Sequence, residues 1–266
     1  KKKNIIYGMN FDTNAIDLKL KVSSYNDVNF FYFSGLLDNQ YRDIAGFNSE
    51  GLFFFFQAVE YSPGFNASYN ENDWFAFDIF DEALKSASKT TDFIKILNKR
   101  IISYPRNPLF PDLGLHTLFA DKTGDSFILE EGNDDNVISP IQHDFIIMTN
   151  FYNGDFKEAL YNEVYGRGAD RYICAYEYIL NNIHDFGVAE AFEVLSKTSR
   201  EDTLCSIVYD PSKNDIYMSF KKDMSKKWKI SIDEKTIQSL NGLLSNNKIQ
   251  FTNEEILVKD LISLYK

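Results

Sequence analysis

Few residues of this chain could do chemistry, and the two cysteines are the first to consider. Cys174 and Cys205 could each supply a thiolate, the reactive form of the side chain. Cys174 falls one turn into a predicted helix, and Cys205 falls inside a predicted strand. Neither belongs to a CxxC pair, and two cysteines cannot form a disulfide framework. We therefore interpret both as packed, inert thiols.

The histidines and acidic clusters do not predict a metal site. His116, His143 and His184 lack the spacing of zinc ligands. Residues 121–125 (DKTGD) resemble a calcium loop only superficially, because the glycine is fourth and not sixth. The acidic pairs at 130–131 and 134–135 have polar neighbours, so we interpret them as solvated loop residues. We expect neither a metal nor another cofactor.

Motifs for nucleotide and serine-hydrolase chemistry are also missing. The chain contains no GxxxxGK[ST] loop and no GxSxG turn. Residues 166–168 (GRG) precede a predicted helix but lack the third glycine of a dinucleotide-binding loop. The remaining candidates are polar residues at the ends of predicted strands and helices.

Composition indicates a globular protein with an acidic surface. The chain has 266 residues, of which 44% are hydrophobic and 25% are charged, and a net charge of −11. No 18-residue apolar stretch occurs, so no segment is predicted to span a membrane. The negative charge disfavours nucleic acid as a partner. Free thiols and the absence of a signal peptide favour the cytoplasm, and a homo-oligomer is compatible with the sequence.

The elements that must position the polar residues alternate between strands and helix pairs. Strands are predicted at residues 5–11, 18–22, 30–33, 51–56, 115–120, 126–130, 145–148, 204–209, 216–220 and 228–232. Helix pairs are predicted at 74–86 with 91–102 and at 172–183 with 188–195, and a final helix follows Asn253. We expect one α+β domain over residues 1–266 in which helix pairs cover two mainly antiparallel sheets, a four-layer αββα sandwich.

Aromatic residues are unusually frequent, with 24 Phe and 16 Tyr. Two stacked layers of strand side chains need bulky residues to fill the core, which is one explanation. The alternative is that some Phe side chains line an apolar ligand pocket.

Six short segments together resemble one enzyme family. They are residues 8–12 (GMNFD), 46–52 (GFNSEGL), 116–121 (HTLFAD), 148–151 (MTNF), 170–172 (DRY) and 203–211 (TLCSIVYDP). In this order and approximate spacing they are similar to N-terminal-nucleophile amide hydrolases of the choloylglycine hydrolase and penicillin V acylase type. Acyl-coenzyme A:6-aminopenicillanate acyltransferases and acid ceramidases are related. The resemblance covers nearly the whole chain and implies the αββα fold.

The resemblance implies a cysteine nucleophile at the start of the mature chain. In that family the thiol attacks an amide carbonyl, and the α-amine of the same cysteine accepts the proton. The nucleophile begins a strand that turns into the segment matching residues 8–12. We therefore expect this cysteine about one strand length upstream of Lys1, with the first strand of the domain lacking from residues 1–266.

Three residues match the family's supporting positions. Asp12 would hold and orient the α-amine, and Asn150 would donate to the oxyanion. Arg171 would support the surroundings of the nucleophile. Each also has a structural interpretation: Asp12 as a turn residue, Asn150 as the end of a strand, and Arg171 as an ion-pair partner at a helix start.

Two departures from the family pattern concern substrate-binding positions. Met9 stands where the family has an arginine, and methionine supplies neither charge nor donor. Arg171 could compensate, or catalysis could be altered or lost. Ala58 lies near a polar or aromatic position of the relatives, with Glu60 and Tyr61 as the nearest replacements. Phe65 and Tyr61 are expected to line an apolar cleft.

The sequence therefore supports a hydrolase that cleaves the linear amide C–N bond of a small N-acyl substrate. An acyltransferase on the same site is a variant in which an amine or thiol replaces water. A non-catalytic protein that binds acyl ligands is the alternative from another class, and Met9 favours it.

Overall fold

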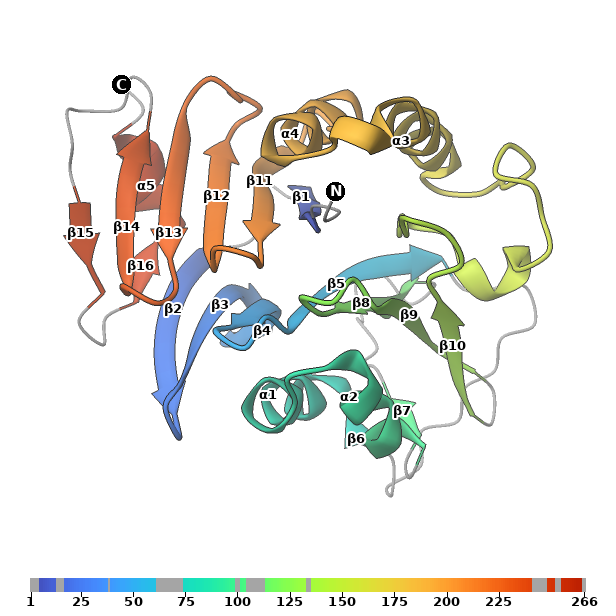
Figure 1. Cartoon of the computed structure of the whole chain (residues 1–266), viewed down its shortest axis with the longest axis horizontal. Coiled ribbons are helices and arrows are strands. Elements are labelled where there is room, and N and C mark those ends of the chain that lie inside the picture. The colour runs from blue at the N-terminus through green and yellow to red at the C-terminus, as the bar shows by residue number, and fades with distance from the viewer. Residues whose placement is uncertain are drawn as a thin grey trace. The chain divides into compact units, whose positions relative to one another are not determined.

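The computed structural model describes residues 5–12, 17–37, 39–60, 74–98, 101–103, 113–132, 135–240, 248–251 and 255–264. The chain, drawn in Figure 1, divides into two compact units. The first combines Lys1–Gly51 with Asn181–Lys266, and the second is Leu52–Leu180. The prediction that residues 1–266 form a single domain stays a prediction.

The first unit contains a six-stranded antiparallel sheet in the order β1-β11-β12-β13-β14-β15. Its strands are β1 (Tyr7–Asp12), β11 (Thr203–Asp210), β12 (Asp215–Phe220), β13 (Lys227–Ser231), β14 (Thr236–Leu240) and β15 (Lys248–Gln250). The sequence indicated β13 as the last strand of the chain, which is wrong, because β13 continues into a hairpin with β14. Tyr209 of β11 and Trp228 of β13 are among the largest fully buried side chains of the sheet.

A second layer of strands in this unit has the order β16-β2-β3-β4. It comprises β16 (Ile256–Leu257), β2 (Leu18–Tyr25), β3 (Val28–Leu37) and β4 (Gln40–Asn48). Aromatic rings join this layer to the six-stranded sheet: Phe11 lies 5.5 Å from Phe33, and Phe47 lies 4.8 Å from Tyr209. The two layers therefore share a core.

Helix α4 (Val188–Lys197) covers the opposite face of β1 and β11 (Figure 1). Successive side chains of a strand point to opposite faces. Gly8 faces α4, because a Cβ there would lie 3.4 Å from Leu195, and Asn10 also donates to the Leu195 carbonyl. Met9 and Phe11 consequently point the other way, between the two strand layers. The short helices η2 (Ile183–Asp185) and α5 (Val258–Ser263) complete the unit.

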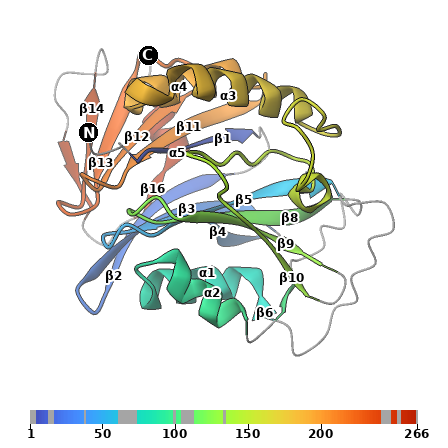
Figure 2. The same cartoon turned by 45° about the vertical axis from the view of Figure 1, so that its right-hand side comes forward.

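The second unit contains four antiparallel strands in the order β10-β9-β8-β5. They are β5 (Phe53–Glu60), β8 (Leu113–Ala120), β9 (Ser126–Glu131) and β10 (Asn136–Pro140). Helices α1 (Ala76–Ser86) and α2 (Thr90–Leu97) lie along one face of these strands (Figure 2). Strands β6 (Trp74–Phe75) and β7 (Ile102–Ser103) form a parallel pair, and η1 (Asn153–Phe156) and α3 (Ala169–Asn182) follow β10.

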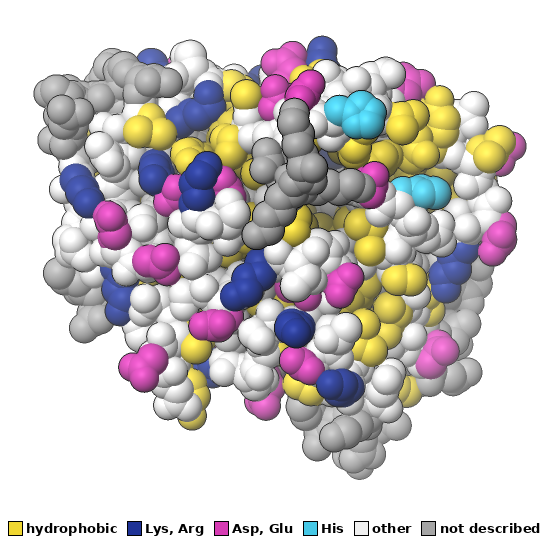
Figure 3. Space-filling model, in the orientation of Figure 1, with side chains coloured by type: hydrophobic (Ala, Val, Ile, Leu, Met, Phe, Trp, Pro, Cys, Tyr) yellow, Lys and Arg dark blue, Asp and Glu magenta, His cyan; other side chains and the backbone are white. Residues whose placement is uncertain are grey.

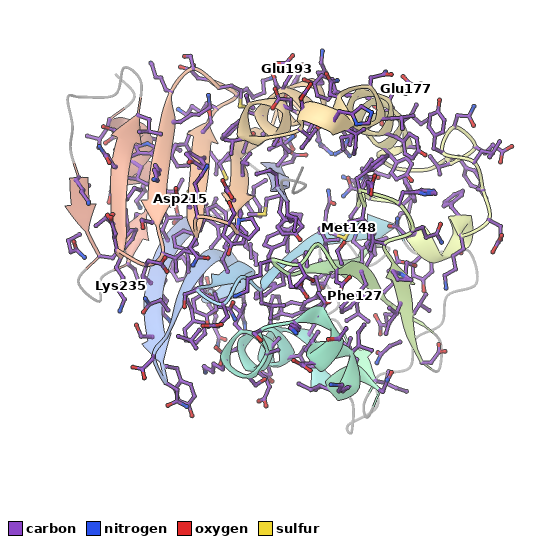
Figure 4. The ribbon with its side chains drawn as sticks, in the orientation of Figure 1. Phe127, Met148, Glu177, Glu193, Asp215 and Lys235 are labelled. Carbon is purple, nitrogen blue, oxygen red and sulfur yellow. The ribbon has the colours of Figure 1, made fainter. Side chains whose placement is uncertain are left out.

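Phenylalanine rings fill the space between the helix pair and the strands. Phe54 stacks on Phe80 at 4.6 Å, and Phe93 lies 4.4 Å from Phe119. Phe127, labelled in Figure 4, stacks on Phe119 at 5.2 Å. All five rings are buried, which confirms for them the prediction that phenylalanine fills the core.

Two elements differ from their sequence predictions: the strand at 145–148 does not form, and the helix at 91–102 is shorter. Residues 145–148 form no strand; they have no regular secondary structure and are half-buried, and Phe145 packs on Tyr176 of α3 at 5.0 Å. Helix α2 stops at Leu97, and Ile101 is 37% exposed, so the four-residue apolar spacing overestimated this helix.

The surface mixes both signs of charge. On the face shown in Figure 3, acidic and basic side chains are interspersed, and hydrophobic side chains lie between them. None of the helices in the described ranges is long and apolar enough to cross a membrane.

Candidate active site

Asp12, at the end of β1, is held by Arg200 from the turn after α4 and by Thr203, the first residue of β11. The Thr203 hydroxyl donates to Asp12 Oδ1 at 2.5 Å, and Arg200 Nε lies 3.9 Å from Asp12 Oδ2. The side chain of Asp12 is 13% exposed. The register of β1 against β11 shifts between Phe11 and Asp12, which brings Asp12 opposite Thr203. A carboxylate is thus fixed at the strand end.

Arg200 was not recognised in the sequence because its nearest partner in sequence suggests a local surface ion pair. Its Nε and Nη2 donate to Asp202 at 2.9 and 3.2 Å, and its backbone N–H donates to Thr203 Oγ1 at 2.7 Å. The Thr203 hydroxyl therefore accepts from Arg200 and donates to Asp12. The approach of Arg200 to Asp12 depends on how β1 pairs with β11, and the local spacing of residues does not predict that pairing.

Asn10 links β1 to its neighbours. Its amide nitrogen donates to the Leu195 carbonyl at 2.8 Å, and its amide oxygen accepts from the Ser206 hydroxyl at 2.6 Å. The side chain is used within the fold, so its role is structural. Met9, the predicted substrate-binding residue beside it, is 4% exposed and lies between the strand layers.

Asn150, in the second unit, follows the irregular segment that contains Met148 (Figure 4). Arg171 Nη2 of α3 donates to Asn150 Oδ1 at 2.6 Å. Because arginine can only donate, the amide oxygen must face it, and the amide nitrogen must face the other way. Nδ2 donates one hydrogen to the Ala58 carbonyl at 2.7 Å, and the Asn150 carbonyl accepts from the backbone N–H of Glu60 at 2.9 Å.

Gly168 makes the close approach of α3 to Asn150 possible. Its φ of +82° is a conformation that favours glycine, and a Cβ there would lie 2.8 Å from Arg171 Nη2 and 3.2 Å from the Asn150 nitrogen. The structure thus brings together two of the three predicted supporting residues, Asn150 and Arg171. Gly168 was noted in the sequence only as part of an incomplete dinucleotide-binding loop.

The predicted substrate-binding residues are only partly described. Glu60, at the end of β5, is exposed, and its Oε2 accepts from the Arg167 backbone N–H at 3.4 Å. Tyr61 and Phe65 lie outside the described residues, so the apolar cleft expected there stays a prediction.

A buried histidine–carboxylate pair lies on β8 and β9. His116 Nδ1 is 3.0 Å from Glu130 Oε1, and both side chains are 0% exposed. Glu130 also accepts from the backbone N–H groups of Asn153 and Gly154 at 2.7 and 2.8 Å. The interpretation of 130–131 as solvated loop residues is therefore wrong, because Glu131 is buried as well. The hydrogen bonds from the backbone of η1 offset the cost of burying the Glu130 carboxylate.

Neither cysteine contributes an exposed thiol to the groups around Asp12 or around Asn150. Cys205 is fully buried in β11, and burial, followed by the charge of Asp12, raises the pKa of its thiol. Cys174 is half-buried on α3. Within the described ranges, no group of three or more His, Cys, Asp or Glu residues is arranged to hold a metal ion.

Three solved structures share the arrangement of strands and helices. A mutant of the conjugated bile acid hydrolase from Clostridium perfringens is 14% identical, with a TM-score of 0.60 over 95% of this chain and 92% of that chain. The penicillin V acylase from Agrobacterium tumefaciens is 13% identical, with a TM-score of 0.63 over 91% and 89%. The chain has the N-terminal-nucleophile (Ntn) hydrolase fold. The predicted four-layer αββα architecture is confirmed.

A third Ntn hydrolase extends the comparison. The N-acylethanolamine-hydrolyzing acid amidase ortholog of Caenorhabditis elegans is 17% identical, with a TM-score of 0.55 over 78% of this chain and 88% of that chain. No family model matches the sequence, and no curated protein matches it. The structural similarity shows the fold, and at these low identities the activity must be argued from the site.

Proposed function

We propose that this chain is part of a cysteine Ntn amidase that cleaves the linear amide C–N bond of a small N-acyl substrate. The observation that carries the proposal is the fixed amide of Asn150. Its oxygen is occupied by Arg171, which leaves Nδ2 as the end that can donate. One Nδ2 hydrogen binds the Ala58 carbonyl, and the second is the one proposed to bind an oxyanion.

Asp12 is proposed to orient the α-amine of the nucleophilic cysteine. The carboxylate is fixed by the Thr203 hydroxyl and lies beside Arg200. A cysteine at the mature N-terminus, in residues that precede Lys1 in the natural protein, would supply both the thiol and the amine. Cys205 is unsuited to that role because it is fully buried within β11.

The proposed reaction proceeds in two steps that conserve atoms and charge. The cysteine sulfur forms a bond to the amide carbonyl carbon, the thiol proton passes to the α-amine, and Asn150 donates to the oxyanion. The C–N bond then breaks, and the departing amine takes that proton. Water attacks the resulting thioester, the C–S bond breaks, and the acid leaves with the thiol restored.

The substrate class is proposed from the names of proteins with the same fold. Those names specify conjugated bile acids, penicillin V and N-acylethanolamines. A small N-acyl amide is the class that these substrates share. Met9, Glu60 and the expected cleft residues Tyr61 and Phe65 are proposed to contribute to its binding.

The test begins with protein expressed from its complete gene. Intact mass and N-terminal sequencing should identify a mature terminus at a cysteine, and substitution of that cysteine by alanine should abolish amide hydrolysis. The same substitution should leave the unfolding midpoint nearly unchanged. A mature protein without that cysteine, or an alanine variant with full turnover, would overturn the proposal.

A panel of amides with one leaving amine and different acyl groups tests the proposed cleft. We expect kcat/KM to rise with acyl apolarity, by roughly 10–200-fold for each well-filled increment. A charged acyl group would lack a partner in an apolar cleft and should be rejected. A flat profile, or a preference for charged acyl groups, would contradict the apolar cleft.

A non-catalytic protein that binds acyl ligands is a second candidate, and Met9 favours it. Met9 is buried and supplies no charge beside Asp12. Such a protein would bind an N-acyl amide and return it unchanged, which equilibrium binding combined with product analysis detects. An acyltransferase would instead form a new amide or thioester when an amine or thiol acceptor is added.

A further inference from the structure

In the described part of the chain, two carboxylates and one guanidinium meet at the end of β1. Asp12 and Asp202 each contribute a carboxylate, and Arg200 lies between them, 3.9 Å from Asp12 Oδ2 and 2.9 Å from Asp202 Oδ1. Arg200 is 37% exposed, whereas Asp12 is 13% exposed. The guanidinium therefore comes from the solvent side to a carboxylate that is mostly shielded from water.

Two contacts keep Arg200 in this place. Its guanidinium donates two hydrogen bonds to the Asp202 carboxylate, and this bidentate contact fixes the plane of the guanidinium. Its backbone N–H donates to Thr203 Oγ1, and that hydroxyl donates to Asp12. The turn and the start of β11 thus position a cation and a hydroxyl against one carboxylate, and Met9 on β1 provides no charge of its own.

The charge balance matters because the proposed base is an amine. A carboxylate beside an α-amine stabilises its protonated form and raises its pKa above the usual 7.7–8.0. A protonated amine cannot accept the thiol proton. A guanidinium beside the carboxylate opposes this effect and favours the neutral amine.

We infer that Arg200 is a positioning residue that offsets the charge of Asp12 and so keeps the α-amine of the nucleophile available as a base near neutral pH. This inference rests on the proposed function. Arg171, the residue that the sequence suggested as compensation for Met9, donates a hydrogen bond to Asn150. Arg200 acts at Asp12 itself, and it acts through charge and position without touching the substrate.

Among the described residues, the charged and titratable groups at this point come from β1, from the turn before β11 and from β11 itself. Asp12 lies on β1, Arg200 and Asp202 lie on the turn before β11, and the Cys205 thiol lies inside β11. Burial raises the pKa of the Cys205 thiol, so it stays neutral across the pH range of the test. Arg200 stays charged throughout. The acid limb of activity should therefore report the amine and its neighbours.

The pH profile of kcat/KM for Arg200→Gln tests the inference. Loss of the cation should move the acid limb to higher pH by about 0.3–0.8 units, the size expected for one partly solvated charge. At a pH below the limb this corresponds to a loss of about 2–6-fold, recovered at higher pH. Arg200→Lys should restore most of the original profile.

Two further variants check the sign and the location. Asp202→Asn removes a negative charge, so its acid limb should move to lower pH. Lys197→Gln removes a cation at the end of α4 that pairs with Glu193, and its limb should stay within about 0.2 units. A shift in Lys197→Gln equal to that in Arg200→Gln, or no shift in Arg200→Gln, would overturn the inference.

An NMR measurement that does not depend on catalytic activity separates this inference from the proposed function. The Nε–H resonance of Arg200 in the full-length protein should move in Asp12→Asn if the two side chains pair. An unmoved resonance refutes the pairing and the inference with it. If the resonance moves in a full-length protein that hydrolyses no amide, the proposed function is refuted, and the catalytic role of Arg200 with it, whereas the Arg200–Asp12 ion pair is confirmed.

Discussion

Substituting Glu130 by glutamine tests a fully buried carboxylate of the second unit. The carboxylate is 0% exposed and accepts from His116 Nδ1 and from the backbone N–H groups of Asn153 and Gly154, at 2.7–3.0 Å. The glutamine amide keeps one oxygen as an acceptor. Its NH₂ group must then face at least one of these donors, which replaces a hydrogen bond by a contact between two donors.

The magnitude follows from the bonds that are lost. A hydrogen bond to a charged group contributes about 1.5–3 kcal/mol, and a buried donor left without an acceptor adds its own cost. We expect Glu130→Gln to lower the free energy of unfolding by about 2–4 kcal/mol. With an m-value of about 3 kcal/mol/M in urea, the unfolding midpoint should fall by about 1 M.

Urea unfolding followed by circular dichroism provides the assay, with Glu82→Gln as the matched control. Glu82 is an exposed residue of α1, so the same chemical change there should alter stability by less than about 0.5 kcal/mol. Equal midpoints for the two variants would refute the reasoning, because the three bonds to Glu130 would then contribute nothing net.

Three further outcomes are expected. Asn150→Ala should lower kcat by roughly 10²–10³ on an amide that the wild-type protein hydrolyses. Unchanged turnover would show that Asn150 has only a structural role. Gly168→Ala should destabilise the protein by about 1–3 kcal/mol in chemical denaturation, because φ is +82° and the new Cβ would crowd Arg171; an unchanged midpoint would contradict this. Cys205 should resist iodoacetamide until the protein unfolds, since burial raises its pKa, whereas half-buried Cys174 should react first; peptide mass spectrometry on native protein would reveal the opposite order.

The layered fold could be predicted from the sequence because its cause is local. Four consecutive phenylalanines at 53–56 indicate a strand buried on both faces, and all four are buried in β5. Helical spacing likewise placed Phe80 and Phe93 on the faces that pack against strands. These patterns depend on the period of side chains along one element.

The candidate site was only partly predictable because its contacts are long-range. Glu130 has acidic and polar neighbours in sequence, yet its partners come from another strand and from a turn more than twenty residues later. Arg200 has an acidic neighbour in Asp202, which hides its approach to Asp12. Residues 145–148 have the composition of a strand, but apolar content alone does not supply a pairing partner.

The order of synthesis gives the interleaving of the two units a consequence. The second unit is continuous, Leu52–Leu180, so it can begin to fold while the ribosome is still extending the chain. The first unit joins the beginning of the chain to its end, and β1 must wait until β11 has emerged, because Asp12 and Thr203 are 191 residues apart. A product of premature termination before Arg200 would therefore carry Asp12 without the Arg200 guanidinium and the Thr203 hydroxyl that hold it.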